Sequence, residues 1–147
     1  MAAGNGSALI VYPDTSLLIA ALVEEPGSER ADAWLTELAA HLALSGWLEV
    51  ELASALAAKE RRRGITREQL AAALAVYRQQ LKPSASWLTV TDRALARATS
   101  MVEAAPGLRG GDALHLSMAE IQDALLVTLD RQQAELGSGL GVKTQLI

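Results

Sequence analysis

The sequence predicts a single α/β domain in which a parallel sheet is covered by helices on both faces. Two patterns support this fold class: the predicted strands are short, near-continuous apolar runs, and they alternate with segments of helical periodicity. The composition agrees with both. Half of the 147 residues are hydrophobic but aromatic residues are scarce, so the core must consist of Leu, Val, Ile and Ala, which suit helices packed closely on a sheet.

The first part of the chain contains two predicted strands and four predicted helices. Pro13 ends the first apolar run, and Ser45 is placed to cap the third helix. Thr66 and Gln69 form a capping-box pattern that opens the fourth helix, directly after a helix stop at Gly64. These signals predict a strand over 8–12, helices over 16–23 and 28–38, a strand over 41–44, and helices over 45–63 and 66–83.

The second part continues the alternation. Its patterns predict a strand over 87–90, helices over 92–105 and 110–122, and strands over 125–129 and 142–146. The glycine-rich segment 137–141 does not link a strand to a long helix, which argues against a nucleotide-binding loop. We expect residues 1–7 to form a flexible leader and residues 8–147 to form one domain.

Composition excludes several classes of protein. The chain has no Cys, so it forms neither disulfides nor thiolate metal sites, and its two His disfavour a zinc site. Charges interrupt every apolar stretch before the roughly 18 residues that a membrane span needs, and the leader does not resemble a signal peptide. We therefore expect a cytoplasmic protein with no membrane partner. A net charge of −4 argues against nucleic-acid binding by electrostatics alone, but not against a nuclease that binds cations.

Two aspartates stand at the carboxyl ends of predicted strands, and a third lies in the first turn of a predicted helix. Asp14 follows the first strand directly, Asp130 follows the fourth, and Asp112 lies in the first turn of a helix after two glycines. Ligands of open parallel sheets bind beyond the carboxyl ends of the strands. Each aspartate taken alone is explained equally well as a turn former or a helix cap. Together they offer the carboxylate oxygens that Mg²⁺ or Mn²⁺ prefers.

Four segments carry a resemblance to a known family. They are Asp-Thr-Ser at 14–16, Glu-Leu-Ala-Ser-Ala-Leu at 51–56, Leu-Arg-Gly-Gly-Asp-Ala-Leu-His-Leu at 108–116, and Thr-Leu-Asp at 128–130. In order and spacing they resemble the PIN-domain family, and within it the VapC-type toxins of bacterial toxin–antitoxin systems. The resemblance implies a three-layer α/β/α fold with a five-stranded parallel sheet, a Mg²⁺ or Mn²⁺ site, and cleavage of RNA phosphodiester bonds. It also implies a cognate VapB-type antitoxin and a homodimer.

The same resemblance assigns the site residues. The acids of the family fall on Asp14, Glu51, Asp112 and Asp130, which would act as metal ligands and catalytic groups. Hydroxyls that orient the acids or a water fall on Ser16, Thr15 and Thr128.

The glutamate on the third helix is the one placement that the residues leave open. Glu49 and Glu51 lie on different helix faces, and both faces contain apolar neighbours, so periodicity does not choose between them. The match to the family segment at 51–56 selects Glu51.

Basic residues and histidines are secondary candidates. Arg61, Arg62 and Arg63 form the densest basic run, which either complements a helix dipole or grips phosphate. Arg109, beside the helix of Asp112, is a comparable candidate for contact with RNA. His115 follows Asp112 by one turn, but its apolar surroundings indicate a packed, hydrogen-bonded side chain, and His41 is interpreted as structural.

Two other functions compete with a ribonuclease. An aspartyl-phosphate phosphatase also begins with an Asp after the first strand, but such an enzyme needs a second Asp where this chain has Ser16. This chain also lacks the catalytic Lys that such an enzyme has after a later strand. A PIN-fold protein that binds partners without catalysis is the non-enzymatic alternative, although the four acids are present. The residues do not choose between tRNA, rRNA and mRNA as the target, or between one and two metal ions.

Overall fold

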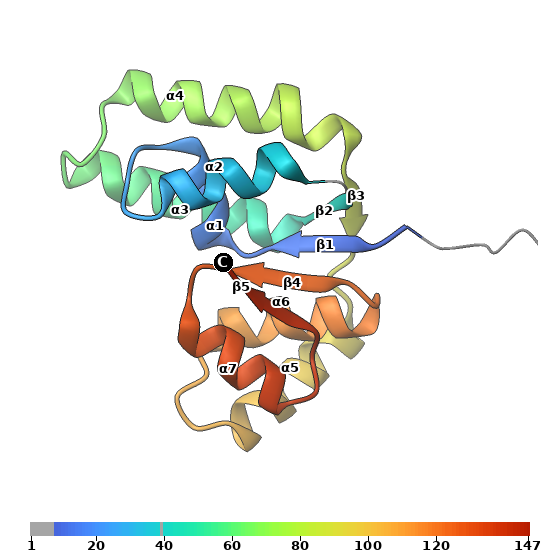
Figure 1. The fold of residues 1–147 in the computed structure, drawn as a ribbon. Coiled ribbons are helices and arrows are strands. Elements are labelled where there is room, and N and C mark those ends of the chain that lie inside the picture. The colour runs from blue at the N-terminus through green and yellow to red at the C-terminus, as the bar shows by residue number, and fades with distance from the viewer. Residues whose placement is uncertain (1–7, 39) are drawn as a thin grey trace, which may run out of the picture.

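The computed structural model describes residues 8–38 and 40–147, and over these residues the chain forms a five-stranded parallel sheet flanked by helices (Figure 1). The predicted fold class is confirmed. The strand order is β3-β2-β1-β4-β5, and each neighbouring pair is parallel. The strands are β1 (Ile10–Pro13), β2 (His41–Ser45), β3 (Ser86–Leu88), β4 (Leu125–Thr128) and β5 (Thr144–Leu146). The predicted leader, residues 1–7, lies outside the described residues.

Helices fill every connection between successive strands. They are α1 (Thr15–Leu22), α2 (Ser28–Glu37), α3 (Gly46–Arg61), α4 (Arg67–Val76), α5 (Asp92–Ala104), α6 (Gly110–Ile121) and α7 (Arg131–Gly139). A π-helical segment, Tyr77–Leu81, and a 3-10 turn, Lys82–Ser84, continue α4 towards β3. Ser45 and Thr66 cap α3 and α4 as predicted, the latter with the reciprocal bond from Gln69. Within the described part of the chain, each helix is too short or too polar to span a membrane.

Helix α7 is the element that the sequence patterns do not predict. Its N-cap is Asp130, whose carboxylate accepts the backbone N–H groups of Gln132 and Gln133. Asp followed after three residues by Gln is the spacing of a capping box, so a signal exists in the sequence. Glycines at 137 and 139 obscure it, because glycine disfavours helix interiors.

The C-terminal end of α3 also differs from the prediction. The helix ends at Arg61, two residues early, and Arg63 rather than Gly64 adopts the left-handed conformation, with φ of 59°. The backbone N–H of Gly64 then bonds to the carbonyl oxygen of Lys59 and closes the helix end.

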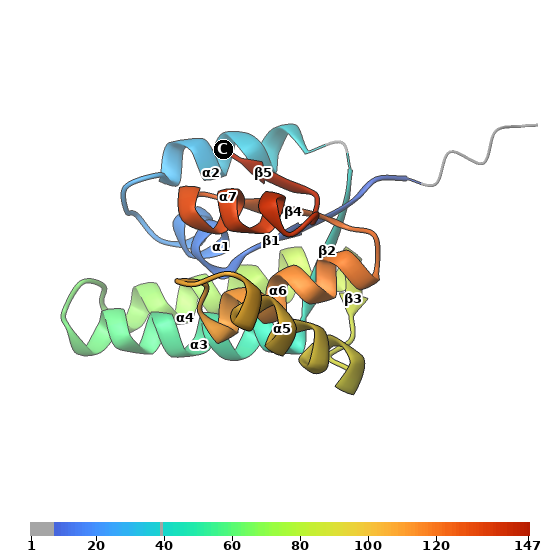
Figure 2. The same ribbon diagram turned by 90° about the horizontal axis from the view of Figure 1, so that it is seen from below.

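Alternate residues of the central strands face two different cores. Tyr12 on β1 and Leu126 on β4 belong to the larger core, which includes side chains of α3, α5 and α6. Val11 and Val127 belong to the smaller core, where α1 and α2 cover the sheet. Figures 1 and 2 show α2 and the pair α5 and α6 on opposite sides of the sheet. This arrangement gives the three layers of the fold.

The order of the strands reverses between β1 and β4. The connections from β1 lead outwards to β2 and β3, whereas β4 lies on the other side of β1 and leads to β5. The carboxyl ends of β1 and β4 meet at the same edge, where their arrowheads lie together in Figure 1. An open parallel sheet forms its ligand site at such a reversal.

Gly137 lets α7 pack closely against α6 and β5. A Cβ atom at this position would lie 2.5 Å from Cδ2 of Leu116 and 2.8 Å from Cγ2 of Thr144. We expect Gly137→Ala to lower the free energy of unfolding by about 1–3 kcal/mol, because the core must shift to accept the methyl group. Urea denaturation measures the change.

Gly139→Ala is the matched control for Gly137→Ala. It lies in the same helix, and a Cβ atom there would meet no atom within 4 Å. We expect the control to be neutral or to stabilise the chain by up to about 1 kcal/mol through helix propensity. Equal effects of the two substitutions would contradict the close packing of α7.

Candidate active site

Asp14 is the most buried acid among the residues that the structure describes. It caps α1 at the end of β1, and 5% of its surface is exposed. Its Oδ1 accepts the backbone N–H of Leu17 at 3.0 Å, its Oδ2 accepts the hydroxyl of Thr128 at 2.6 Å, and the hydroxyl of Ser16 lies within 3.0 Å of both oxygens. Burial raises the pKa of the Asp14 carboxyl above its ordinary value, and these hydrogen bonds oppose the rise without cancelling it.

Glu51 projects from the second turn of α3 and faces α6. Its Oε1 accepts the hydroxyl of Thr15 at 2.8 Å and also contacts Nε2 of His115. Partial burial raises the pKa of Glu51, but the interaction with His115 and the hydrogen bond from Thr15 outweigh it, so the net shift is downward. Glycine at position 111 permits this approach, because a Cβ atom there would lie 3.0 Å from Oε2.

Glu49 lies outside this group. Its Oε1 forms an ion pair of 2.6 Å with Nζ of Lys82, which follows α4. The packing of α3 therefore brings Glu51 to the other acids and directs Glu49 towards the α4 side of the helix.

The acidic edge, as we call the group of Asp14, Glu51, Asp112 and Asp130, is completed by the last two of these residues. Asp112 lies in the first turn of α6, half-buried, with Nε of Arg109 at 3.6 Å. Burial raises the pKa of Asp112, and the charges of Asp130 and Glu51 raise it further against the opposing effects of Arg109 and His115. Asp130 caps α7, so it has the helix-capping function that its sequence position also allows. Asp112 therefore lies near enough to both Asp130 and Glu51 for their negative charges to act on its carboxyl.

His115 is the residue whose importance the sequence patterns do not reveal. It is 1% exposed and hydrogen-bonded, as its apolar surroundings predict. Its Nδ1 lies 2.7 Å from the hydroxyl of Tyr12, and its Nε2 contacts Glu51. The available signal is the spacing of three residues from Asp112, which puts both side chains on one face of α6. His41, by contrast, is exposed and bonds to Ser86 between β2 and β3.

The arginines that are candidates for contact with RNA lie in two different parts of the fold. Arg109 is exposed over 80% of its side chain and stands beside Asp112. The run of Arg61, Arg62 and Arg63 is exposed at the far end of α3, about ten residues or roughly 15 Å along the helix from Glu51. Within the described residues these three arginines form no ion pair.

The acids fit a hard divalent cation by their donor chemistry. They offer only carboxylate oxygens, without sulfur, and the negative charges of Asp130 and Glu51 contribute to the raised pKa of Asp112, which a bound cation would oppose. Among the residues that the structure describes, no three acid or His side chains converge closely enough to enclose one ion on their own. Mg²⁺ binds through one or two carboxylates and retains several waters, so a looser group suits it.

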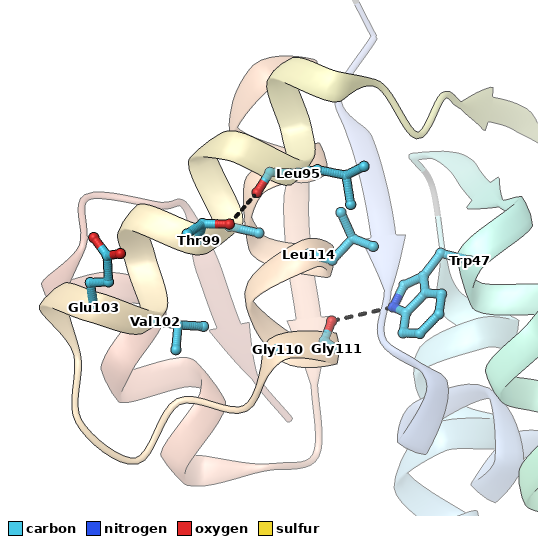
Figure 3. Close-up of a pocket in the computed structure, with 9 residues that line it drawn as sticks. Trp47, Leu95, Thr99, Val102, Glu103, Gly110, Gly111 and Leu114 are labelled. Atoms are coloured by element: carbon cyan, nitrogen blue, oxygen red, sulfur yellow. Dashed lines mark hydrogen bonds between the residues drawn. The ribbon is translucent and has the colours of Figure 1, made fainter.

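An apolar hollow of about 600 Å³ lies between α3, α5 and the start of α6, where Gly110 and Gly111 line it (Figure 3). Trp47 projects towards it from α3, and its indole N–H donates to the carbonyl of Gly111, the residue before Asp112. Leu95 and Val102 of α5 and Leu114 of α6 form most of the remaining wall. Leu95 and Val102 are among the large apolar side chains that the structure leaves exposed.

Comparisons with known proteins place this chain in a family. A model of the PIN domain matches residues 11–138. The chain is similar to VapC20 of Mycobacterium tuberculosis, a sarcin-ricin loop cleaving toxin, with 16% identity, a TM-score of 0.68 and coverage of 90% of this chain and 95% of that one. PAE2754 of Pyrobaculum aerophilum is 25% identical, with a TM-score of 0.62 and coverage of 88% and 86%. A toxin-antitoxin complex from Klebsiella pneumoniae is 15% identical, with a TM-score of 0.56 and coverage of 84% and 88%. The comparison with curated proteins gives no match.

The chain belongs to the PIN-domain family, because the family model spans most of its length. Its fold is that of the VapC-type toxins in this family, as the match to VapC20 shows over nearly the whole of both chains. The resemblance carried by the segments at 14–16, 51–56, 108–116 and 128–130 is thereby confirmed.

The raised pKa of Asp14 predicts how stability depends on pH without metal. Between its ordinary value of 3.8 and the raised value, the folded chain binds more protons than the unfolded chain, so the free energy of unfolding falls as pH rises. Asp14→Asn removes the carboxyl group that causes this pH dependence. We expect the stability of the variant relative to wild type to increase from about pH 4 to pH 7, measured by urea denaturation in EDTA.

Asp123→Asn is the control for Asp14→Asn. It removes an exposed carboxylate that pairs with Lys143, so it tests the general effect of removing one negative charge. A stability difference between wild type and Asp14→Asn that stays constant over the same pH range would contradict the effect of burial on Asp14.

Proposed function

We propose that this chain is a metal-dependent endoribonuclease that acts as the toxin of a toxin–antitoxin pair. The observation that carries the proposal is the grouping of Glu51, Asp112 and Asp130 with the buried Asp14 at the strand-order reversal of a PIN domain. The fold shared with VapC20, a toxin that cleaves the sarcin-ricin loop, supports RNA as the substrate class.

We propose that Asp14, Glu51, Asp112 and Asp130 hold one or two Mg²⁺ or Mn²⁺ ions. Such an ion, when bound, acidifies water and neutralises phosphate charge in an in-line displacement. The chain itself supplies the fixed positions of the acids. Neither a His nor a Ser nucleophile is required.

Hydrogen bonds fix two of these acids before any ligand binds. Ser16 and Thr128 orient the carboxylate of Asp14, and the hydroxyl of Thr15 restrains Glu51. Because these carboxylates are already held in place, little reorganisation of Asp14 and Glu51 is needed when a cation binds. This agrees with the supporting function that the family pattern implies for all three hydroxyl residues.

Arg109 is the basic residue best placed to contact the RNA backbone. Its exposed guanidinium lies beside Asp112, so a phosphate at the acidic edge lies within reach of both the cation site and Arg109. The run at 61–63 lies roughly 15 Å away from Glu51 along α3. We propose that it contacts more distant phosphates or complements the helix dipole.

We propose two protein partners, a VapB-type antitoxin and a second copy of this chain. The similar structure from Klebsiella pneumoniae is a toxin-antitoxin complex, which supports the antitoxin. The exposed apolar side chains of Leu95 and Val102 beside the hollow support the second copy, because water contacts them unfavourably in a monomer.

The nuclease activity is tested with the purified chain, free of any partner. We expect it to cleave total tRNA or a structured RNA in Mn²⁺ or Mg²⁺, and to lose the activity in EDTA. Asp14→Asn and Asp112→Asn should lower the rate by at least about a hundredfold, since each removes a proposed ligand. Asp123→Asn, distant from the site, should cleave at the rate of wild type.

The melting temperature distinguishes the possible negative results. A metal-dependent rise of the melting temperature without cleavage would indicate a narrow RNA target absent from the tube. Absence of both cleavage and metal-dependent stabilisation would overturn the proposal and leave a binding protein with a PIN fold.

The proposed dimer is tested by light scattering over a range of protein concentrations. We expect wild type to have the mass of a dimer and Val102→Glu to have the mass of a monomer, because a buried unpaired charge opposes association. Val76→Glu changes an equally exposed valine on α4 and should remain dimeric. A monomeric wild type, or a dimeric Val102→Glu, would contradict this surface as the interface.

A further inference from the structure

Behind Glu51, three buried side chains form a continuous line of hydrogen bonds. Nε2 of His115 contacts Oε1 of Glu51, and Nδ1 of His115 lies 2.7 Å from the hydroxyl of Tyr12. That hydroxyl lies 2.6 Å from Oγ of Ser45. All three side chains are excluded from solvent. The line joins β1, α6 and the N-cap of α3, and the hydrolysis proposed above assigns nothing to Tyr12 or Ser45.

The donors and acceptors along this line fix the positions of its protons. Oγ of Ser45 accepts the backbone N–H of Leu48 at 3.0 Å. Its own proton has one acceptor among the hydrogen bonds of the described residues, the oxygen of Tyr12. Tyr12 then donates its proton to Nδ1 of His115. The proton of the neutral imidazole is therefore on Nε2, where it is donated to Glu51.

Each alternative arrangement leaves an unfavourable contact. If Tyr12 donated to Ser45, the buried Ser45 proton would have no acceptor within the described part of the chain, and burying an unpaired donor is costly. If a neutral His115 carried its proton on Nδ1, the lone pair of Nε2 would face the carboxylate of Glu51. The Thr15 hydroxyl, 3.3 Å from Nε2, does not relieve this contact, because it donates its proton to Glu51 at the shorter distance of 2.8 Å.

We propose that Ser45 and Tyr12 hold His115 as the Nε2–H tautomer and that His115 positions Glu51 for the cation, an inference that rests on the proposed function. His115 and Thr15 both bind the same oxygen of Glu51, Oε1. Oε2 has no hydrogen bond among the described residues, and the absent side chain of Gly111 leaves it space. The line thus restrains one oxygen and leaves the other free to bind a metal ion. His115 is a positioning residue in this arrangement.

The tautomer is tested directly by nitrogen NMR of the metal-free chain labelled at histidine. The chain contains two histidines, so His41→Gln assigns the signals of His115. We expect a protonated Nε2 and an unprotonated Nδ1 at neutral pH, and loss of this signature in Tyr12→Phe. A protonated Nδ1 in wild type would overturn the proposal without any bearing on the nuclease activity.

The positioning of Glu51 is tested by Mn²⁺ binding, followed through the paramagnetic resonance signal of the free ion. We expect Tyr12→Phe to weaken binding roughly tenfold and His115→Leu to weaken it by about ten- to a hundredfold, the usual range for partners of metal ligands. His115→Gln should recover part of the loss, because its amide nitrogen replaces Nε2 as a donor.

Two matched controls accompany these variants. Tyr77→Phe removes another buried tyrosine hydroxyl outside the line, and His41→Leu removes the other histidine. Both should bind Mn²⁺ as wild type does. Circular dichroism verifies folding, and if His115→Leu does not fold, Tyr12→Phe decides the question.

The outcomes separate this inference from the proposed function. If wild type binds Mn²⁺ and cleaves RNA while Tyr12→Phe and a folded His115→Leu bind Mn²⁺ within about twofold of wild type, the positioning is overturned and the nuclease stands. If wild type neither binds Mn²⁺ nor cleaves RNA, the proposed function fails, and the inference fails with it. Equal losses in the controls would also overturn the inference, since they would show a general effect of altering the core.

Discussion

The parallel pairing of β1 with β4 brings Asp14 and Thr128, 114 positions apart in the sequence, into a hydrogen bond of 2.6 Å. The same pairing makes the backbone N–H of Asp14 a donor to the carbonyl of Val127. A shift of the register by one residue would turn the side chain of Thr128 to the opposite face of the sheet and leave the buried Asp14 with one hydroxyl donor fewer. The remaining acids are arranged around this edge, so the site depends first on how two strands align.

Burial and hydrogen bonding act against each other at this edge. Removal from water raises the pKa of Asp14 and Asp112, which lowers the stability of the charged forms in the folded chain. Hydrogen bonds from hydroxyl and backbone groups recover part of that cost for Asp14, and the contact with His115 does so for Glu51. A metal ion would remove the remaining repulsion. The fold thus keeps acids close together at a cost in stability that ligand binding would repay, a common arrangement at functional sites.

Helix N-termini hold three of the four acids. Asp14 caps α1, Asp130 caps α7, and Asp112 lies in the first turn of α6. The sequence presents each of these aspartates as either a helix cap or a site residue, and a position at a helix N-terminus is compatible with the metal binding proposed for them. A cap fixes the carboxylate at the end of a strand, and the positive end of the helix dipole reduces the repulsion between neighbouring acids. Glu51, the fourth acid, lacks this support and is held by side chains instead.

The sequence by itself determined the order of the strands and of all helices but α7, the caps of α3 and α4, and the position of Asp14 after β1, because apolar runs, capping residues and prolines act locally. It carried too weak a signal for α7, where glycines mask the cap at Asp130. Helix periodicity did not choose between Glu49 and Glu51, and Glu51 was selected only by the family segment at 51–56. The packing of α3 against Gly111 gives the physical reason, because it turns Glu51 towards α6 and leaves Glu49 paired with Lys82. The line from Ser45 through Tyr12 to His115 joins elements from three parts of the chain. No local pattern encodes it, because hydrogen bonds between distant residues depend on how the helices pack against the sheet.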